Sequence, residues 1–427
     1  MLTTFATHPT RHHLLLTFLS FTTSSATRST TSTSDTLLET LSPSGGLKLS
    51  VISHPTLVND LLLQQDPTGL AARALGKVSA MGLMGASGMK GTVSNLHPIK
   101  NHARAPDDDE NEGTFHLCVT CTGPFKSITT ISTSNHTFRG FIEDPSVDTT
   151  PAPFRIPISL AEGIGVTKST LSTCKRPTKY SKDYIGVTDL KNGDLDQGFR
   201  EYYANSEQRK VILQTGCVVK PVRGFGGVSI CTAAGGYFLE RLPECDEREW
   251  SHVAGNLKGL IDKYVSKTAG ELEKESGESD EVFEAGVGEK GGLNLIEALL
   301  CKEKFSAREV SQMMFEGLGE LSGDGKSAET LSDAVPKLKC TCSKERVLRS
   351  VFLMGREAVD EILESGTPVV AYCQFCQQKT VVSIEEVEDD MELRALLEAD
   401  EKKKRKPRGR VPKGKVWHAG RGEWVDT

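Results

Sequence analysis

The pattern of hydrophobic and polar positions divides the chain near Glu249. Before that residue, runs such as FHLCVTCTG, SITTISTS and KVILQTGCVV are rich in β-branched and aromatic residues and are bounded by Gly, Asn and Pro, as strands usually are. Two helices are expected among them: the segment 70–92, whose small residues let another element approach closely, and the segment DLDQGFREYYANSEQ. The pattern predicts an α+β core domain at residues 36–248.

From Glu249 onward the apolar periodicity is helical. The segment EWSHVAGNLKGLIDKYVSKTA is amphipathic, and LNLIEALLCKE and SAREVSQMMFEGLG follow it. In the last of these, Ser306 and Glu309 have the spacing of a capping box. An acidic, Gly-rich stretch at 270–292 is typical of a flexible insertion, and 319–336 is a soft Gly/Ser-containing link. We predict a helical linker at residues 249–339.

The two ends of the chain have biased compositions. The first acidic residue is Asp35, and the Ser/Thr-rich residues before it carry Arg and His, as organellar transit peptides do. We therefore exclude residues 1–35 from the fold and expect a chloroplast or mitochondrial location. A secretory signal with its apolar core at Leu14–Phe21 and a disordered tail of a cytoplasmic protein are the alternatives. At residues 393–427 a basic tail, EKKKRKPRGRVPKGK included, is typical of disorder or of an arm that contacts RNA or ribosomes.

Overall composition narrows the class of protein. A net charge of −6 gives no general attraction to nucleic acid or to an anionic membrane. The longest apolar run, LLLTFLSF, is well below the roughly 20 residues of a membrane helix, so we expect no membrane partner. Eleven cysteines, an odd number, argue against a fully paired secreted disulfide framework. The glycines near Lys90 lack a Gly-Lys-Ser/Thr ending, so no nucleotide site is expected.

Four cysteines form two close pairs near the C terminus. Cys340 and Cys342 are separated by one residue, and after thirty residues Cys373 and Cys376 follow as C-x-x-C. An extended C-x-C places both side chains on one face, and C-x-x-C at a tight turn can hold one ion, so each pair supplies one edge of a tetrahedron. The spacing predicts one zinc ion per chain with these four thiolates as ligands.

The residues around these cysteines predict a small module at 340–392. A helix is expected from the capping residue Ser343 to Gly366, followed by a hairpin whose turn carries the second pair. The module has little apolar mass, so metal binding should supply much of its folding free energy. Because protein ligands fill all four positions, zinc hydrolase chemistry is disfavoured and we do not expect an enzyme. The site is either a permanent structural staple or, because thiolates can be oxidised, a redox switch.

Other cysteines have simpler interpretations. Cys118 and Cys121 also form a C-x-x-C, but in a strand residues three apart face opposite sides of the sheet, so they do not easily share one ion. We interpret them as packing and exposed residues. Cys301, alone in IEALLCKE, is expected to be buried packing, with a further oxidation step as the alternative.

The sequence resembles the heat shock protein of 33 kDa family, the redox-regulated holdases also called 33 kDa chaperonins. The resemblance covers roughly residues 45–390 and includes the four-cysteine motif with CTCSKERV. It continues in GMKG (Gly88–Gly91), FRGFIEDP (Phe138–Pro145), GVTDLKNGDL (Gly186–Leu195), FREYYANSEQ (Phe199–Gln208) and AAGGYFLERLP (Ala233–Pro243). The chain departs from the family in its N-terminal presequence, its enlarged linker and its basic tail.

The resemblance implies a mechanism. In that family the reduced, zinc-bound form is largely inactive, and oxidation releases zinc, unfolds the linker and exposes a surface that binds unfolded client proteins without ATP. Carried over, Cys340 pairs with Cys342 and Cys373 pairs with Cys376 as redox-switch disulfides, thiol reductants reverse them, and the oxidised protein is a homodimer. The apolar linker residues Met313, Met314 and Phe315 are candidate client contacts.

Two other functions remain open at this point. A constitutive RNA- or ribosome-binding zinc protein would use the basic tail, bind polyanions with strong salt dependence and ignore peroxide. A thiol–disulfide oxidoreductase would need one exposed C-x-x-C of low pKa, and a closed four-cysteine frame disfavours it.

Overall fold

In the computed structural model, the described residues are 35–89, 112–147, 159–178, 181–221, 229–275, 293–321 and 326–389, with two short strands at 415–418 and 423–426. Of the transit peptide predicted at 1–35, residues 1–34 lie outside these ranges, as do most of the acidic insertion and residues 401–414 of the basic run. Within the described helices, none combines the length and the apolar character needed to cross a membrane.

One antiparallel sheet has five strands. Its order is β10 (Glu329–Ala334), β1 (Thr36–Leu41), β2 (Leu47–Ser53), β9 (Ser229–Arg241), β8 (Val211–Pro221). The segment predicted as a soft link at 319–336 thus contains a strand, because Leu37–Leu41 offers its free edge to β10, with a register shift between Glu39 and Thr40. The linker therefore re-enters the sheet formed by the N-terminal strands.

The second sheet has six strands. Its order is β11 (Lys337–Leu338), β5 (Thr137–Ile142), β4 (Ser127–Thr133), β3 (Thr114–Thr120), β6 (Ser169–Arg176), β7 (Tyr184–Leu190). Buried and partly exposed residues alternate along β3, β4 and β5, so one face of this sheet packs on the core and the other faces outward. The two-residue strand β11, just before Cys340, pairs in parallel with β5.

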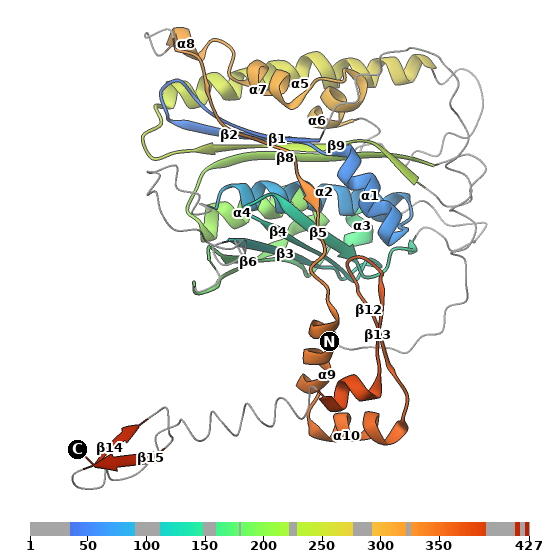
Figure 1. Cartoon of the computed structure of the whole chain (residues 1–427). Helices are drawn as coiled ribbons and strands as arrows, with labels where there is room; N and C mark the ends of the chain where they lie inside the picture. The colour runs from blue at the N-terminus through green and yellow to red at the C-terminus, as the bar shows by residue number, and fades with distance from the viewer. Residues whose placement is uncertain are drawn as a thin grey trace, which may run out of the picture. The chain divides into compact units, whose positions relative to one another are not determined.

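Helices fill the space between the two sheets, as Figure 1 shows. They are α1 (Pro55–Gln65), α2 (Gly69–Ser87), α4 (Leu195–Ser206), the short α3 (Leu160–Ile164) and the 3-10 turn η3 (Lys191–Gly193). Helix α2 contacts both sheets, and its glycines make this possible: a Cβ at Gly85 would collide with Phe115 and one at Gly76 with Cys217. The expectation that small residues let α2 pack closely is confirmed.

The linker lies against the outer face of the five-stranded sheet (Figure 1). Its helical segments are α5 (Glu247–Glu275), α6 (Leu295–Glu297), the π-helical turn η4 (Ala298–Lys302), α7 (Ala307–Met314) and α8 (Leu318–Leu321). The predicted capping box of α7 is confirmed: the Ser306 side chain accepts from the backbone N–H of Glu309, and the Glu309 carboxylate accepts from that of Ser306. Met314 and Phe315 are buried here, and Met313 is partly buried.

The cysteine module contains α9 (Lys344–Leu353), α10 (Arg356–Ser365) and the hairpin of β12 (Val369–Tyr372) and β13 (Lys379–Val382). Ser343 caps α9 as predicted, but the expected single helix is wrong. The chain breaks at Gly355, whose φ of 97° is a conformation that favours glycine, and α10 starts anew and ends at Gly366. Near the C terminus, β14 (Lys415–His418) pairs with β15 (Glu423–Asp426), and Trp417 is opposite Trp424. The α+β class is confirmed, whereas the domain boundaries stay predictions.

Candidate metal centre

The four predicted cysteines converge on one point. Their Sγ atoms all lie within 4.8 Å of one another. The Sγ atoms of Cys340 and Cys373 are 3.6 Å apart, and those of Cys342 and Cys376 are 3.4 Å apart. Two segments separated by thirty residues thus supply two thiols each to one cluster.

Local structure explains how each pair reaches the cluster. Cys340 and Cys342 lie on the extended segment between β11 and α9, so their side chains share a face. Cys373 and Cys376 bound the turn between β12 and β13, where the N–H of Gln377 donates to the carbonyl of Cys373. Gln377 has a φ of 57°, which tightens this turn. We call residues 373–376 the knuckle.

The donor set fits a thiophilic, tetrahedral ion. With a Zn–S distance of about 2.3 Å, neighbouring sulfurs of a ZnS₄ tetrahedron are about 3.8 Å apart, close to the contacts seen here. Soft thiolates favour zinc over Mg²⁺ or Ca²⁺, which prefer oxygen ligands. The residues present can therefore hold one metal ion in a closed site with four protein ligands.

Protonation of the bare thiols is uneven. Burial and hydrogen bonding with Cys376 raise the pKa of Cys342, and burial also raises the pKa of Cys376. Burial pushes the pKa of Cys340 upward too, but hydrogen bonds from Cys342 and the other thiols outweigh it, so this pKa is lowered. A thiolate at one corner is thus stabilised by S–H donors at the others, a role that a bound cation fills more strongly.

The module around this site has a small core. Four side chains are buried among its described residues: Val351, Val359, Val382 and Val387. Large apolar side chains such as Leu353, which is 87% exposed, lie at its surface. So few buried groups cannot outweigh the conformational entropy of about fifty residues, so a metal ion held by the four thiols would be a main source of the module's stability.

The knuckle also contacts the core domain. The Nε2 of Gln65, at the end of α1, donates to the carbonyls of Gln374 and Phe375 at 2.9 and 2.6 Å. The Phe375 ring meets the Phe141 ring of β5 edge-to-face, with centroids 5.1 Å apart, and the guanidinium of Arg139 lies 4.8 Å from the Phe375 centroid. We call Gln65, Arg139 and Phe141 the seat of the knuckle.

Arg139 links the seat to the other pair of cysteines as well. Its guanidinium donates to the Thr341 hydroxyl, which also accepts from Arg346. Burial and the nearby Arg346 lower the pKa of Arg139, while Cys340 and Cys373 oppose that change, yet a guanidinium keeps its proton at any physiological pH. A fixed positive charge therefore stands beside a cluster that carries a net negative charge when four thiolates hold a dication.

Sequence reasoning did not assign these seat residues. Arg139 and Phe141 belong to the FRGFIEDP motif, but nothing in the sequence links that motif to a phenylalanine more than two hundred positions later. Gln65 carried no signal at all. The C-x-x-C pattern located the knuckle but did not indicate that Phe375 contacts the core domain.

The remaining cysteines are not brought to the cluster. Cys118 is half-buried on the outer face of the six-stranded sheet and Cys121 is buried just after β3, and neither belongs to the four-thiol cluster. Cys301 is half-buried, with its Sγ 3.8 Å from the Thr232 hydroxyl, and so is less enclosed than predicted. Cys217 and Cys231 lie buried with sulfurs 3.9 Å apart.

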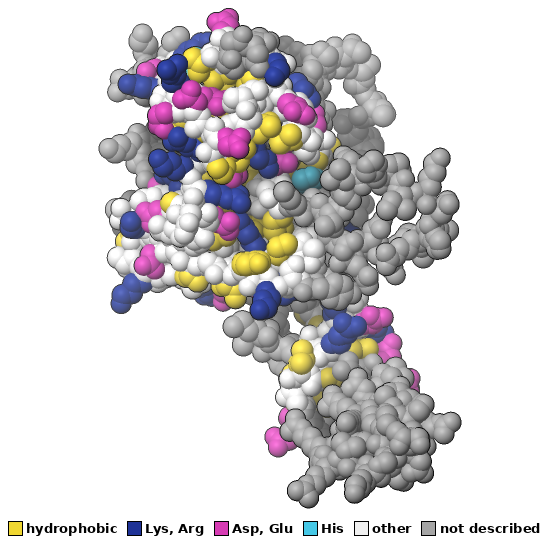
Figure 2. All heavy atoms as spheres, turned by 90° about the vertical axis from the view of Figure 1, so that its left-hand side faces the viewer, with side chains coloured by type: hydrophobic (Ala, Val, Ile, Leu, Met, Phe, Trp, Pro, Cys, Tyr) yellow, Lys and Arg dark blue, Asp and Glu magenta, His cyan; other side chains and the backbone are white. Residues whose placement is uncertain are grey.

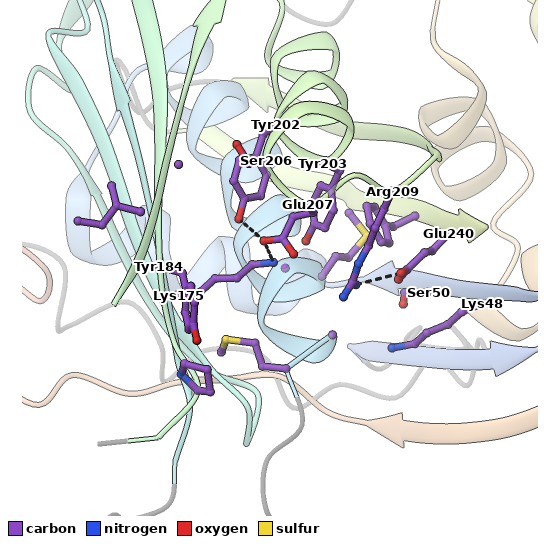
Figure 3. Close-up of a pocket in the computed structure, with 18 of the residues that line it drawn as sticks. Lys48, Ser50, Lys175, Tyr184, Tyr202, Tyr203, Ser206, Glu207, Arg209 and Glu240 are labelled. Atoms are coloured by element: carbon purple, nitrogen blue, oxygen red, sulfur yellow. Dashed lines mark hydrogen bonds and ion pairs between the residues drawn. The ribbon is translucent and has the colours of Figure 1, made fainter. Parts of the chain in front are cut away.

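A cavity of about 580 Å³ lies between the two sheets and was not predicted (Figure 3). The Glu207 carboxylate accepts from Lys175 and from Tyr202, both at 2.7 Å, and Arg209 contacts Glu240 at 2.9 Å. Burial pushes the pKa of Glu207 upward, but these hydrogen bonds and the Lys175 charge outweigh it, and the pKa is lowered. The charges satisfy one another, so the cavity shows no preference for a ligand of either sign.

Comparison with known proteins places the chain among chaperones. Residues 108–383 match the family model described as Hsp33 protein. A 33 kDa chaperonin of Lachnoclostridium phytofermentans is 25% identical over 275 residues, covering 64% of this chain and 76% of the relative. One from Halalkalibacterium halodurans is 23% identical over 358 residues, covering 83% and 97%. The crystal structure of the 33 kDa chaperonin from Thermotoga maritima has the same fold, with a TM-score of 0.59, 16% identity, and coverage of 84% and 99%.

Proposed function

Because this chain belongs to the Hsp33 family of chaperones, we propose that it is an ATP-independent holdase that oxidation of its four clustered cysteines switches on. The observation that carries the proposal is the closed four-thiol site in a module with only a few buried side chains. Such a module depends on its metal, so chemistry at the thiols controls whether it stays folded. The family is one of chaperones, and we propose no catalytic activity.

We propose zinc as the metal, one ion per chain in the reduced form. When bound, zinc keeps Cys340, Cys342, Cys373 and Cys376 as thiolates and joins the two halves of the module. The supporting observation is the all-sulfur donor set with contacts near a tetrahedral edge.

Peroxide would oxidise each cysteine pair in two steps. One thiolate of a pair attacks a peroxide oxygen and becomes a sulfenic acid, with release of hydroxide. Its partner thiolate attacks that sulfur, closes a disulfide and releases a second hydroxide. Two protons from solvent turn both hydroxides into water. Each pair thus loses two electrons to one peroxide, and once both pairs are closed the cluster has no thiolate left to hold a metal.

The pairing of Cys340 with Cys342 and of Cys373 with Cys376 is part of the proposal. The shortest sulfur contacts run across the cluster, from Cys340 to Cys373 and from Cys342 to Cys376. In a tetrahedron all edges are similar, so these contacts do not select a pairing. Once the module loosens, the cysteines that are near in sequence meet far more often, because their connecting loops are the shortest. Peptide mapping after peroxide distinguishes the two patterns.

Loss of the module should then loosen the linker. Strand β11 ties the residues before Cys340 to β5, and β10 ties the end of the linker to β1. The linker helices dock on the five-stranded sheet through apolar packing and several polar contacts. These include Asn294 to the carbonyl of Thr215 at 3.0 Å, Thr40 to Ser311 at 2.9 Å and the buried pair of Arg73 and Glu297 at 3.5 Å. Freed helices would expose Met314 and Phe315, and flexible or aromatic apolar side chains of this kind bind unfolded proteins with little sequence preference.

The direct test follows metal and client together. Reduced full-length protein is treated with peroxide while a chromogenic chelator reports zinc and light scattering reports a heat-denaturing client. We expect about one zinc per chain to be lost and client aggregation to be suppressed only afterwards, and dithiothreitol to reverse the effect. A control variant, Cys118→Ser, should behave as the wild type. Retained zinc with unchanged scattering would contradict the switch.

Further proposals concern partners and location. We propose a homodimer of the oxidised form, reduction by cellular thiols, and an organellar address in the residues before Asp35, supported by their lack of acidic side chains.

The alternative function, RNA binding, depends on the basic tail. On the face of the molecule in Figure 2, Lys and Arg are mixed with Asp and Glu, so this face offers no large uniformly basic surface for RNA. A nucleic-acid filter assay over a salt series, with and without residues 393–427, tests it.

A further inference from the structure

The knuckle rests on the core domain in a way that resembles the binding of a short peptide. Its aromatic side chain, Phe375, packs against Phe141 and under the guanidinium of Arg139. Two successive backbone carbonyls, those of Gln374 and Phe375, accept hydrogen bonds from one side-chain amide, that of Gln65. The seat therefore recognises an aromatic ring and the main chain beside it, and neither feature is specific to this knuckle.

The contact is built to be reversible. Phe141 and Phe375 are both only half-buried, so the ring pair is partly open to water. Gln65 is buried, with 6% of its surface exposed, and in the described structure its amide has the knuckle carbonyls as acceptors. If the knuckle leaves, this amide loses both acceptors, and another backbone segment can restore them.

The surface continues from the seat across the six-stranded sheet. Strand register places two rows of side chains on its outer face. One row is Phe141, Thr129, Cys118, Ser172 and Val187, and the other is Arg139, Ile131, His116, Cys174 and Ile185. All of these residues are half-buried or exposed.

Both rows end at an edge of the sheet, where the described part of the chain places no further strand beside β7. Strand β7 is the last strand of the sheet order, and its outward residues Ile185 and Val187 are 72% and 62% exposed. Short apolar and small polar side chains mix along the rows, a composition that suits weak contacts with many sequences. An unpaired strand edge adds backbone groups that an extended chain can bond.

We propose that the seat is a client-binding site, and that in the reduced protein Phe375 occupies the place of a client's aromatic side chain. The ligand is an extended segment of an unfolded protein with Phe, Tyr or Trp, whose carbonyls bond Gln65 and whose chain runs over the outer face toward β7. This inference rests on the proposed holdase function and names the surface that meets the client. Closing a disulfide between Cys373 and Cys376 reshapes the knuckle and vacates the seat.

Substitutions of the two phenylalanines distinguish a client-binding site from a purely structural latch, meaning a contact that only holds the module on the core domain. Phe375→Ser and Phe141→Ser both remove the ring pair and loosen the knuckle to a similar extent. A latch predicts that both variants hold clients better in the reduced state. The client-binding site predicts opposite signs: Phe375→Ser raises holding of a denaturing client at least threefold in the reduced state, whereas Phe141→Ser lowers it in the oxidised state by a similar factor.

Two further variants test whether a change in client holding comes from the seat. Tyr372→Ser removes a neighbouring aromatic ring that is 63% exposed and should leave holding unchanged. Gln65→Leu keeps the side-chain volume, removes both donors and should act like Phe141→Ser, so the test survives if one seat variant folds poorly. Seat variants that keep full activity when oxidised would overturn the proposal.

A binding measurement tests the site without any oxidation. The probe is a short fluorescein-labelled peptide of Ser and Thr with one central Phe, compared with its Ala twin by anisotropy. Reduced full-length Phe375→Ser should bind the Phe peptide at least fivefold more tightly than the Ala peptide, and adding Phe141→Ser should abolish the difference. Equal binding of both peptides would overturn the site. An oxidised wild type that fails to hold clients would overturn the holdase function instead, and the peptide result would still decide the site.

Discussion

The core domain and the cysteine module achieve stability by different means. The core buries a continuous cluster that includes Leu75, Phe115, Phe138 and Phe199 between two sheets. The module buries four valines and brings four thiols together. Apolar burial responds weakly to oxidants, whereas a thiolate-held metal is lost when the sulfur is oxidised. Under the proposed function, the core domain would therefore stay folded while oxidation unfolds the neighbouring module.

The linker shares features with both the core domain and the cysteine module. Its helices bury Leu299, Val310 and Met314 on the outer face of the five-stranded sheet, as a core would. Yet after β10 and β11, which pair with β1 and β5 of the core, it leads directly into Cys340 of the module. Its long helix α5 ends at Glu275, inside the predicted acidic insertion. Its stability should therefore fall between that of the core and that of the module.

The largest expected effect comes from removing two thiols. In Cys373→Ser with Cys376→Ser the module loses half of its ligands, and metal binding of order 10 kcal/mol in small zinc sites is lost with them. We expect α9 and α10 to lose amide protection in hydrogen exchange while β3 and β4 keep theirs. Cys121→Ser, at a buried cysteine outside the cluster, is the matched control. Protected module helices without metal would refute the contrast between the two regions.

A substitution in the apolar core should destabilise the core domain and leave the metal site unchanged. Phe199 is fully buried and packs against Phe115, Tyr202 and Tyr203. Phe199→Ala should lower the free energy of unfolding of the core by about 3–5 kcal/mol through lost burial and a cavity. Urea unfolding followed by tyrosine fluorescence measures this, and zinc content should stay at the wild-type level. A parallel loss of zinc would show that the two regions are not independent.

A truncation in the linker should move the switching threshold. Met314 is 1% exposed on the outer face of the sheet, so Met314→Ala should cost the docked linker about 2–5 kcal/mol. We expect faster proteolysis within 249–339 and client holding at a lower peroxide concentration or temperature. Met313→Ala, at a partly buried neighbour, should have a smaller effect. An unchanged threshold in Met314→Ala would show that the linker does not control activation.

The smallest effect concerns pH and the core. His54 is fully buried, and burial lowers its pKa to about 3. The Ser79 hydroxyl donates to the carbonyl of Gly76, so it accepts a hydrogen bond from Nε2–H of His54. The unfolded chain takes up a proton near pH 6.5 and the folded chain does not, so stability is lost as pH falls below 6.5. His54 should thus cost the core about 2 kcal/mol between pH 7 and pH 5.

Urea midpoints at the two pH values measure this loss. His54→Gln keeps a hydrogen-bonding side chain but does not titrate, so it should show a smaller decrease than the wild type. An identical pH dependence in the variant would exclude His54 as the cause.

Sequence patterns identified the four clustered cysteines better than they identified the structure around them. The spacing of Cys340, Cys342, Cys373 and Cys376 identified the cluster, because tetrahedral coordination restricts ligand spacing. The β-branched and aromatic composition of FHLCVTCTG likewise identified β3, and the segment DLDQGFREYYANSEQ was correctly predicted as the helix α4. Two local features were missed. Gly355 breaks the module helix although apolar residues continue on both sides, and β10 forms a strand because β1 has a free edge.

The seat was missed for a different reason. Gln65, Phe141 and Phe375 come from three distant segments, and each is unremarkable in its own window of sequence. Their contact exists only once α1, β5 and the knuckle are placed by the fold. Tertiary contacts between ordinary side chains leave no periodicity and no spacing rule, so sequence reasoning alone cannot find them.

Hydrogen–deuterium exchange on the full chain, before and after peroxide, measures whether oxidation unfolds the module and linker while the core stays folded. We expect oxidation to remove protection from α9, α10 and the linker helix α7, while β3, β4 and α2 keep it. Dithiothreitol with zinc should restore the original pattern. Protection that stays unchanged throughout, or that is lost equally from core and module, would show that the cysteines do not control such a switch.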